Sequence, residues 1–139
     1  MLVLAPSVHE AMIAACLDAW PLEACGLLAG PPPGGDSDDA TVDAHYPAEN
    51  ASRSSRIYSV APRDLLRADR EAEDAGMALI GVWHSHTHTD AWPSPTDVAQ
   101  APDPAWHYVL VSLRDTHPVV RSYRIQDGQI EEEPVALQW

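Results

Sequence analysis

The sequence predicts an α+β domain in which helices flank a curved mixed β-sheet. Apolar runs of strand length recur along the chain, for example from Met77 to Trp83 and from Trp106 to Leu113. Two helical patterns separate groups of such runs, so the order is helix, strands, helix, strands rather than a regular alternation. The 139 residues suit one domain with one core, residues 1–139, and 45% hydrophobic residues argue against disorder.

The first helix is predicted from Ser7 to about Trp20. Ser7 is a candidate N-cap, and Glu10, three residues later, would complete a capping box. Pro21 ends the helix, and a short buried strand is predicted from Glu23 to Ala29. The helix would bury an apolar stripe formed by Val8, Met12, Ala15, Cys16 and Ala19.

The middle of the chain is predicted to hold a loop, two strands and a helix. Residues 31–39 are rich in Pro, Gly and Asp, which is typical of an exposed loop, here a hairpin connection. Strands are predicted from Ala40 to Tyr46 and from Ile57 to Val60. An amphipathic helix should follow from Pro62 to Gly76, because proline favours a helix start and glycine a helix end.

The last third of the chain is predicted to be mostly strand. Strands are expected from Trp106 to Leu113 and from Val119 to Ile125. Asp127-Gly128 is typical of a type I′ hairpin turn, which would lead into a final acidic strand containing Glu131 to Glu133.

The charge balance limits the kinds of partner. Eight basic residues, all arginine, stand against 21 acidic residues, for a formal net charge of -13. Such a chain repels phosphate backbones and anionic lipid, so we expect no nucleic acid and no membrane partner, whereas a basic protein is easier to bind. The first residues lack a basic region, and no apolar run approaches the roughly 20 residues of a membrane span, which predicts a cytoplasmic protein.

The most informative stretch lies at the end of the central apolar run. A strand sends alternate side chains to the same face, so His84 and His86 should point together. Zn²⁺ favours imidazole nitrogen and carboxylate oxygen, so two imidazoles on one face form a partial site that needs a third ligand. Ser94 and Pro95 predict a helix start, which would place Asp97 on its first turn as that ligand.

Each part of this pattern also has a simpler interpretation. Pairs of histidines are commonplace, and Ser94 with Asp97 could be a plain capping pair. His88 could supply a third imidazole, but it lies beyond the predicted strand, so its orientation is not fixed and Asp97 is favoured. Cys16 and Cys25 are too few for a disulfide framework, and we expect them to be reduced and buried.

The combination resembles a known signature. His84-Ser85-His86, seven intervening residues, Ser94, two more residues and Asp97 resemble the His-x-His-x(7)-Ser-x-x-Asp motif of the JAMM (MPN-plus) metalloprotease family, in its bacterial short form. The family pattern includes an upstream glutamate, which Glu23 matches. Thr87 stands where the family usually has proline, a departure that concerns the shape of the loop and no ligand. The resemblance spans nearly the whole chain.

This resemblance implies an MPN-like domain with a catalytic zinc site. Three protein ligands, His84, His86 and Asp97, leave a fourth position for water, which is the arrangement of catalytic zinc. Glu23 would take a proton from that water and pass it to the leaving amine, and the Ser94 hydroxyl would donate to the oxyanion. The implied reaction is hydrolysis of a peptide or isopeptide bond.

The resemblance also implies a class of substrate. JAMM enzymes cut next to the C-terminal Gly-Gly of ubiquitin-fold proteins, and the bacterial short forms resemble hydrolases that release cysteine or another amine from a ubiquitin-like sulfur-carrier protein. We therefore expect such a carrier adduct as the partner. The alternatives are a deubiquitinase-like or desampylase-like isopeptidase acting on lysine-linked conjugates, and a non-catalytic MPN scaffold or binding module. A non-haem Fe(II) oxygenase, which also uses two histidines and one carboxylate, is a further rival.

Overall fold

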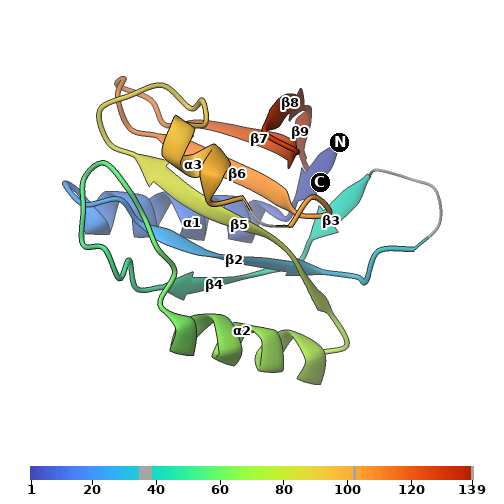
Figure 1. Cartoon of the computed structure of the whole chain (residues 1–139). Coiled ribbons are helices and arrows are strands. Elements are labelled where there is room, and N and C mark those ends of the chain that lie inside the picture. The colour runs from blue at the N-terminus through green and yellow to red at the C-terminus, as the bar shows by residue number, and fades with distance from the viewer. Residues whose placement is uncertain (35–38, 102, 139) are drawn as a thin grey trace.

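A six-stranded mixed sheet forms the centre of the computed structural model, which describes residues 1–34, 39–101 and 103–138. Its strands are β2 (Cys25–Gly30), β4 (Ala44–Ala48), β5 (Ala78–His86), β6 (His107–Ser112), β7 (Val119–Gln126) and β8 (Gln129–Glu133). They follow the order β4-β2-β5-β6-β7-β8 across the sheet (Figure 1). β5 and β6 are parallel and the other neighbours are antiparallel, so the prediction of a mixed sheet is confirmed.

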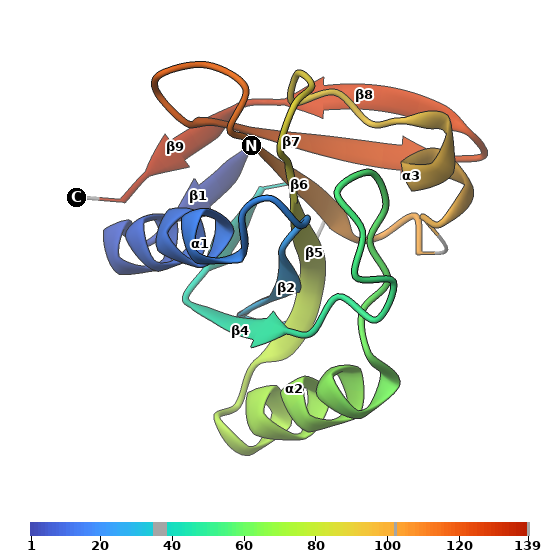
Figure 2. The ribbon, with the colours of Figure 1, turned by 90° about the vertical axis from the view of Figure 1, so that its left-hand side faces the viewer.

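A second sheet consists of three short parallel strands. β1 (Leu2–Leu4) lies between β3 (Ala40–Val42) and β9 (Val135–Leu137), so the first and last strands lie side by side (Figure 2). The prediction of one strand from Ala40 to Tyr46 is wrong, because the chain changes sheet at Asp43. β3 belongs to the small sheet, and β4, which follows Asp43, pairs with β2 in the large one. The alternation of apolar and polar residues continues where the chain passes from one sheet to the other, so the sequence pattern does not reveal the change.

In the described part of the chain, three helices pack against these sheets, and each begins with a proline in its first turn. They are α1 (Pro6–Ala19), α2 (Pro62–Asp74) and α3 (Pro95–Ala99). The capping box predicted for Ser7 and Glu10 is wrong: Ala5 is the N-cap, and no side chain caps this helix. The fixed φ of Pro6 suits the first helical position, so the helix starts before Ser7.

Hydrophobic cores lie on both faces of the six-stranded sheet. On one face, α1 and the small sheet bury side chains such as Met12 and Trp83. On the other face, α2, α3 and their connecting loops cover side chains such as Val82 and Leu110. Figure 2 shows α1 and α3 on opposite sides of the sheet. β5 therefore alternates its side chains between two cores, which explains why its sequence is apolar on both faces.

The connecting segments hold one confirmed turn and one wrong strand. Asp127 and Gly128 both have positive φ, at 50° and 75°, which confirms the predicted hairpin. The strand predicted from Ile57 to Val60 is a loop with a single bridge from Val60 to Asn50. Of the loop predicted over residues 31–39, residues 35–38 lie outside the described part of the chain.

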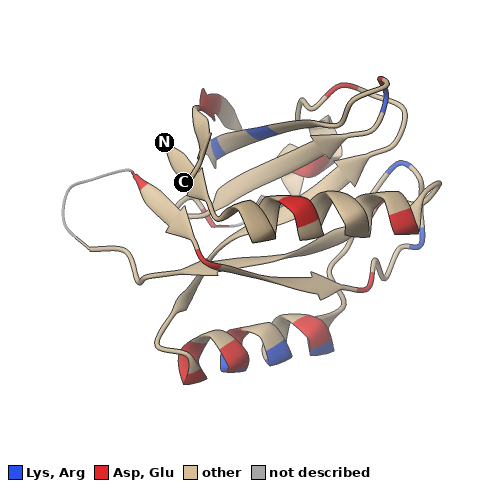
Figure 3. Cartoon of the chain, turned by 180° about the vertical axis from the view of Figure 1, so that it is seen from behind, with Lys and Arg blue, Asp and Glu red and all other residues tan. Residues whose placement is uncertain are grey.

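The charges are distributed unevenly over the helices. α2 carries both acidic and basic positions, whereas α1 carries acidic ones only (Figure 3). On α2 the exposed Arg67 forms an ion pair with the buried carboxylate of Asp64 at 2.9 Å. Among the described residues, no helix is both long enough and apolar enough to cross a membrane.

Candidate metal centre

The end of β5 brings the two predicted histidines to one face of the sheet. His84 and His86 are two residues apart at the end of β5 and share that face, while Ser85 between them points to the opposite side and accepts a hydrogen bond from the backbone N–H of Ala24. β5 pairs with β2 along one edge and with β6 along the other, so its backbone is held on both sides. Both imidazoles are buried, with 2% of His84 and 5% of His86 exposed.

The first turn of α3 supplies the predicted carboxylate. Ser94 Oγ accepts a hydrogen bond from the Asp97 N–H at 3.0 Å, and Asp97 Oδ2 accepts one from the Ser94 N–H at 2.9 Å. The predicted helix start with its capping box is therefore confirmed. These reciprocal bonds hold the Asp97 side chain in one orientation, buried and facing the end of β5.

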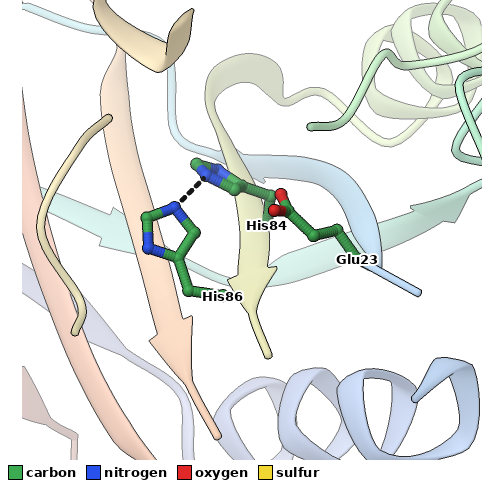
Figure 4. A group of neighbouring side chains, drawn as sticks. All are labelled: Glu23, His84 and His86. Carbon is green, nitrogen blue, oxygen red and sulfur yellow. Dashed lines mark hydrogen bonds between the residues drawn. The ribbon is translucent and has the colours of Figure 1, made fainter. Parts of the chain in front are cut away.

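Three candidate ligand atoms meet between β5 and α3. Asp97 Oδ2 lies 2.9 Å from His86 Nε2 and 3.2 Å from His84 Nε2, and the two nitrogens are 3.2 Å apart. Atoms that are each about 2.0 Å from a tetrahedral zinc ion lie about 3.3 Å apart. The triangle thus has the dimensions of one face of a tetrahedral zinc site. Figure 4 shows the two imidazoles facing each other, with the Glu23 carboxylate close to His84.

The contacts of His86 match those of a metal-binding histidine. Its Nδ1 lies 2.7 Å from the carbonyl oxygen of Asp90, which can only accept, so Nδ1 carries the proton. Burial would lower the pKa of His86, but its hydrogen bonds with Asp97 and Asp90 raise it above its ordinary value, and the protonated ring donates from Nε2 to Asp97 Oδ2 at 2.9 Å. A cation held by Nε2 and Asp97 Oδ2 would take the place of this proton, and a carbonyl behind the imidazole is the usual support of a metal-binding histidine. Two imidazoles and one carboxylate fit zinc.

Burial and hydrogen bonds together set the protonation of these candidate ligands. It lowers the pKa of His84 below its ordinary value although Asp97 opposes the shift, so this ring is neutral, as a metal ligand must be. Burial would raise the pKa of Asp97, but its hydrogen bonds with His84 and His86 hold that pKa well below its usual range. The Tyr58 ring stacks on His84 with centroids 4.0 Å apart and fixes the plane of the imidazole.

Glu23 lies beside this cluster and just before β2, which begins at Cys25 rather than at Glu23 as predicted. Its side chain is buried, and Oε1 has no hydrogen-bond partner among the described residues. One ligand atom each of Glu23, His84 and His86 lie within 4.8 Å of one another. Burial raises the pKa of Glu23 to about 7, with His86 opposing the shift and Asp97 adding to it. A buried carboxylate with a free oxygen at this place can bond a water at the cluster.

Comparisons with known proteins show the family of this chain. Residues 5–126 match the family described as prokaryotic homologs of the JAB domain. The chain belongs to this family. As a JAB-domain protein it is 45% identical over 136 residues to the CysO-cysteine peptidase of Mycobacterium tuberculosis, covering 97% of this chain and 90% of that protein. It is 37% identical over 93 residues to the desampylase of Haloferax volcanii, covering 66% and 63%.

The solved structures include a protein with nearly the same fold. The solution structure of a Desulfitobacterium hafniense protein matches with a TM-score of 0.89 and 36% identity, covering 99% of this chain and 93% of that one. The JAB-domain family also confirms the resemblance to the bacterial short form of the JAMM family.

Other candidates from the sequence lie apart from the ligand triangle in this JAB domain. The exposed His88 bonds the Thr87 hydroxyl at 2.8 Å, and its ring lies 5.9 Å from that of Trp20. Among the described contacts, His88 has none with Asp97. Cys16 and Cys25 are free and buried, and burial raises the pKa of both thiols to about 12, which leaves them protonated at neutral pH.

The JAB domain also uses residues that sequence reasoning missed. Tyr58 stacks on a candidate ligand, and the carbonyl of Asp90 orients another. Tyr58 lay in a segment wrongly predicted as strand, and a backbone carbonyl leaves no trace in side-chain type. No feature of the sequence pattern distinguishes these two positions.

Proposed function

We propose that this JAB domain is a zinc-dependent peptidase that hydrolyses the bond after the C-terminal Gly-Gly of a ubiquitin-fold protein, with a sulfur-carrier adduct as its substrate. The observation that carries the proposal is one cluster: two imidazoles and a carboxylate meet beside a buried glutamate with an unbonded oxygen. Burying four ionisable groups together is costly. A non-catalytic scaffold gains nothing from that cost, so the cluster favours an enzyme.

His84, His86 and Asp97 are the proposed zinc ligands, with a fourth position open to water. When bound, zinc lowers the pKa of its water to about 7 and polarises the substrate carbonyl. Glu23 takes a proton from the attacking water at its carboxylate and later delivers it to the leaving amine. Its pKa of about 7 suits both halves of this transfer near neutral pH, and its unbonded Oε1 is available for them.

Ser94 is proposed to stabilise the oxyanion that forms on the substrate carbonyl. Its Oγ accepts from the Asp97 N–H, so its own hydroxyl proton is directed elsewhere, and it has no acceptor among the described residues. A hydroxyl held by a helix cap next to a metal ligand can donate to a developing negative charge. Loss of such a donor typically lowers turnover by a factor of about 10² to 10³.

The proposed substrate class rests on the relatives. One relative, which matches 97% of the chain, is named a CysO-cysteine peptidase, and this supports a carrier–cysteine adduct as the substrate. The other is named a desampylase and matches 66% of the chain, which favours a lysine-linked conjugate as the second candidate. We further propose that residues 1–139 form one catalytic domain that works in the cytoplasm, where free thiols such as Cys16 and Cys25 persist.

The decisive experiment presents both leaving groups to the zinc-loaded protein. Carriers ending in Gly-Gly are joined either to cysteine or to a lysine side chain, and the products are identified by mass spectrometry. We expect release of the free Gly-Gly end, abolished by a chelator and restored by zinc but not by redox-active iron with oxygen. Failure to cleave any such conjugate by a protein that has bound one zinc ion would sink the proposal.

A further inference from the structure

Asn50 has an unusually complete set of hydrogen bonds. It follows β4, its side chain is buried, and its amide forms hydrogen bonds with backbone groups from three parts of the chain. Nδ2 donates to the carbonyl oxygens of Glu23 at 3.0 Å, Ile57 at 3.1 Å and Ser54 at 3.4 Å. Oδ1 accepts from the N–H groups of Ser52 and Ser59, each at 3.0 Å. Every donor and acceptor of the amide is used.

One of these bonds reaches the backbone of the proposed general base. Glu23 precedes β2, so its peptide groups are not held by the regular ladder of the sheet. Its carbonyl is held by Asn50 Nδ2, and its N–H donates to the Ser54 carbonyl at 2.8 Å. Both partners belong to the loop after β4, and Asn50 Nδ2 also bonds the carbonyl of Ser54. The loop and Glu23 therefore form one connected unit with Asn50 at its centre.

The same amide also determines where Tyr58 lies. Asn50 bonds the carbonyl of Ile57 and the N–H of Ser59, the two residues that flank Tyr58. Tyr58 in turn stacks on His84, with centroids 4.0 Å apart and planes 19° apart. Asn50 thus reaches one proposed metal ligand through an aromatic ring, and the proposed proton carrier through a peptide group.

We infer that Asn50 is a positioning residue for the reaction, which sets the Glu23 carboxylate and the His84 imidazole relative to each other. This inference rests on the proposed function for what the two groups do. Asparagine is common in turns, where its side chain bonds nearby backbone groups, and the bond to Ser52 is of that kind. The bond to Glu23 spans 27 residues and is not needed to form a turn. A misplacement of about 1 Å at a catalytic group can reduce turnover about 100-fold. Loss of the Asn50 hydrogen bonds should therefore lower turnover.

Asn50→Asp is the sharpest test, because it keeps the size and one acceptor while removing both N–H donors from three carbonyl oxygens. Asn50→Ala removes the whole amide. In the zinc-loaded enzymes we expect kcat to fall about 10- to 100-fold in both variants, with KM changed less than about threefold and one zinc retained. A residue with a merely structural role would lower the melting temperature and leave the kcat of the folded, zinc-loaded fraction unchanged. That result would overturn the inference.

Asp64→Ala provides the matched control. The buried Asp64 carboxylate accepts the N–H of Glu49 at 2.8 Å, so it anchors the same loop one residue before Asn50 but does not contact Glu23. Its removal should destabilise the fold by a similar mechanism while kcat stays within about twofold of wild type. A kcat loss in Asp64→Ala equal to that of Asn50→Asp would show that loop destabilisation alone explains the effect, and would overturn the inference.

Crystal structures of the zinc-loaded wild type and Asn50→Asp test the inference without any substrate. We expect the Glu23 carboxylate to leave the vicinity of the two imidazoles in the variant and the Tyr58 ring to lose its stacking on His84. Unchanged positions of both groups would overturn the inference. If the wild type cleaves no conjugate but the variant shows this displacement, the proposed function fails and the positioning by Asn50 stands.

Discussion

At the scale of single residues, Glu23 is the group on which the proposed chemistry depends most. A buried carboxylate with an unbonded oxygen is unfavourable unless the site uses it. We expect Glu23→Gln, which preserves the shape of the side chain, to keep zinc and to lose turnover by about 10²- to 10⁴-fold. Metal content and kcat should be measured on the same sample. Near-normal turnover would remove Glu23 from the mechanism.

Asp97 and Asp90 form a natural pair for testing metal binding. Both lie next to His86, but Asp97 contacts it with its carboxylate, whereas Asp90 contacts it with its backbone carbonyl. Asp97→Ala should therefore lose zinc, while Asp90→Ala, which keeps the carbonyl, should bind one equivalent. Equilibrium dialysis against zinc followed by elemental analysis measures both. Stoichiometric zinc in Asp97→Ala would contradict the ligand assignment.

The convergence of His84, His86 and Asp97 was predictable because local rules place each of them. Strand alternation aligns the two histidines, and a helix cap places the aspartate one turn in. Glu23 is far away in sequence, and only the family resemblance indicated it. Asn50 and Tyr58 could not be predicted, because their roles arise from a loop whose path depends on hydrogen bonds to distant backbone groups.

At the scale of elements, the pairing of β5 with β6 holds the strand that carries His84 and His86. Gly81 pairs with His107, and a Cβ at Gly81 would lie 2.2 Å from the His107 carbonyl oxygen. We expect Gly81→Ala to force these strands apart and to lower the free energy of unfolding by about 1 to 3 kcal/mol, with weaker zinc binding because His84 lies on the same strand. Urea denaturation of both proteins measures the change.

Gly34→Ala is the control for this substitution. A Cβ at the exposed Gly34 would meet nothing within 4 Å, so the stability should stay within about 0.5 kcal/mol of wild type. Equal stability of Gly81→Ala and Gly34→Ala would show that the close approach of β5 to β6 can relax at no cost.

Elements with a strong local signal were predicted well, and those that depend on tertiary context were not. The helix at Pro62 and the cap at Ser94 have proline and polar signals at their starts, and both are confirmed. The strands Leu2–Leu4 and Val135–Leu137 are three residues each, too short for periodicity, and pair only because the fold brings them together. Their existence follows from the two-sheet architecture rather than from their own residues.

At the scale of the whole molecule, Glu133 connects the two sheets electrostatically. It ends β8 in the large sheet, where it bonds His107 on β6 and the Ser122 hydroxyl on β7. Its other oxygen lies 3.7 Å from the amine of Met1, next to β1 in the small sheet. Burial would raise the pKa of Glu133, but the bonds from His107 and Ser122 hold it below its usual value of 4.5. The ionised form thus stabilises the fold.

The pH dependence of stability should reveal this contribution. Since the pKa of Glu133 is lower in the folded state, its stabilisation is complete above the unfolded pKa, near 4.5, and disappears as pH falls through the folded value. Glu133→Gln should lower the free energy of unfolding by about 1 to 3 kcal/mol at pH 7, and the difference from wild type should shrink below about pH 4.5. Urea denaturation of the metal-free proteins from pH 7 to 3 measures this difference, and the absence of metal keeps zinc binding out of the comparison.

Glu131→Gln, at an exposed neighbouring position, is the control and should alter stability little at any of these pH values. A wild-type advantage that is constant across this range would mean that Glu133 acts through packing rather than through its charge.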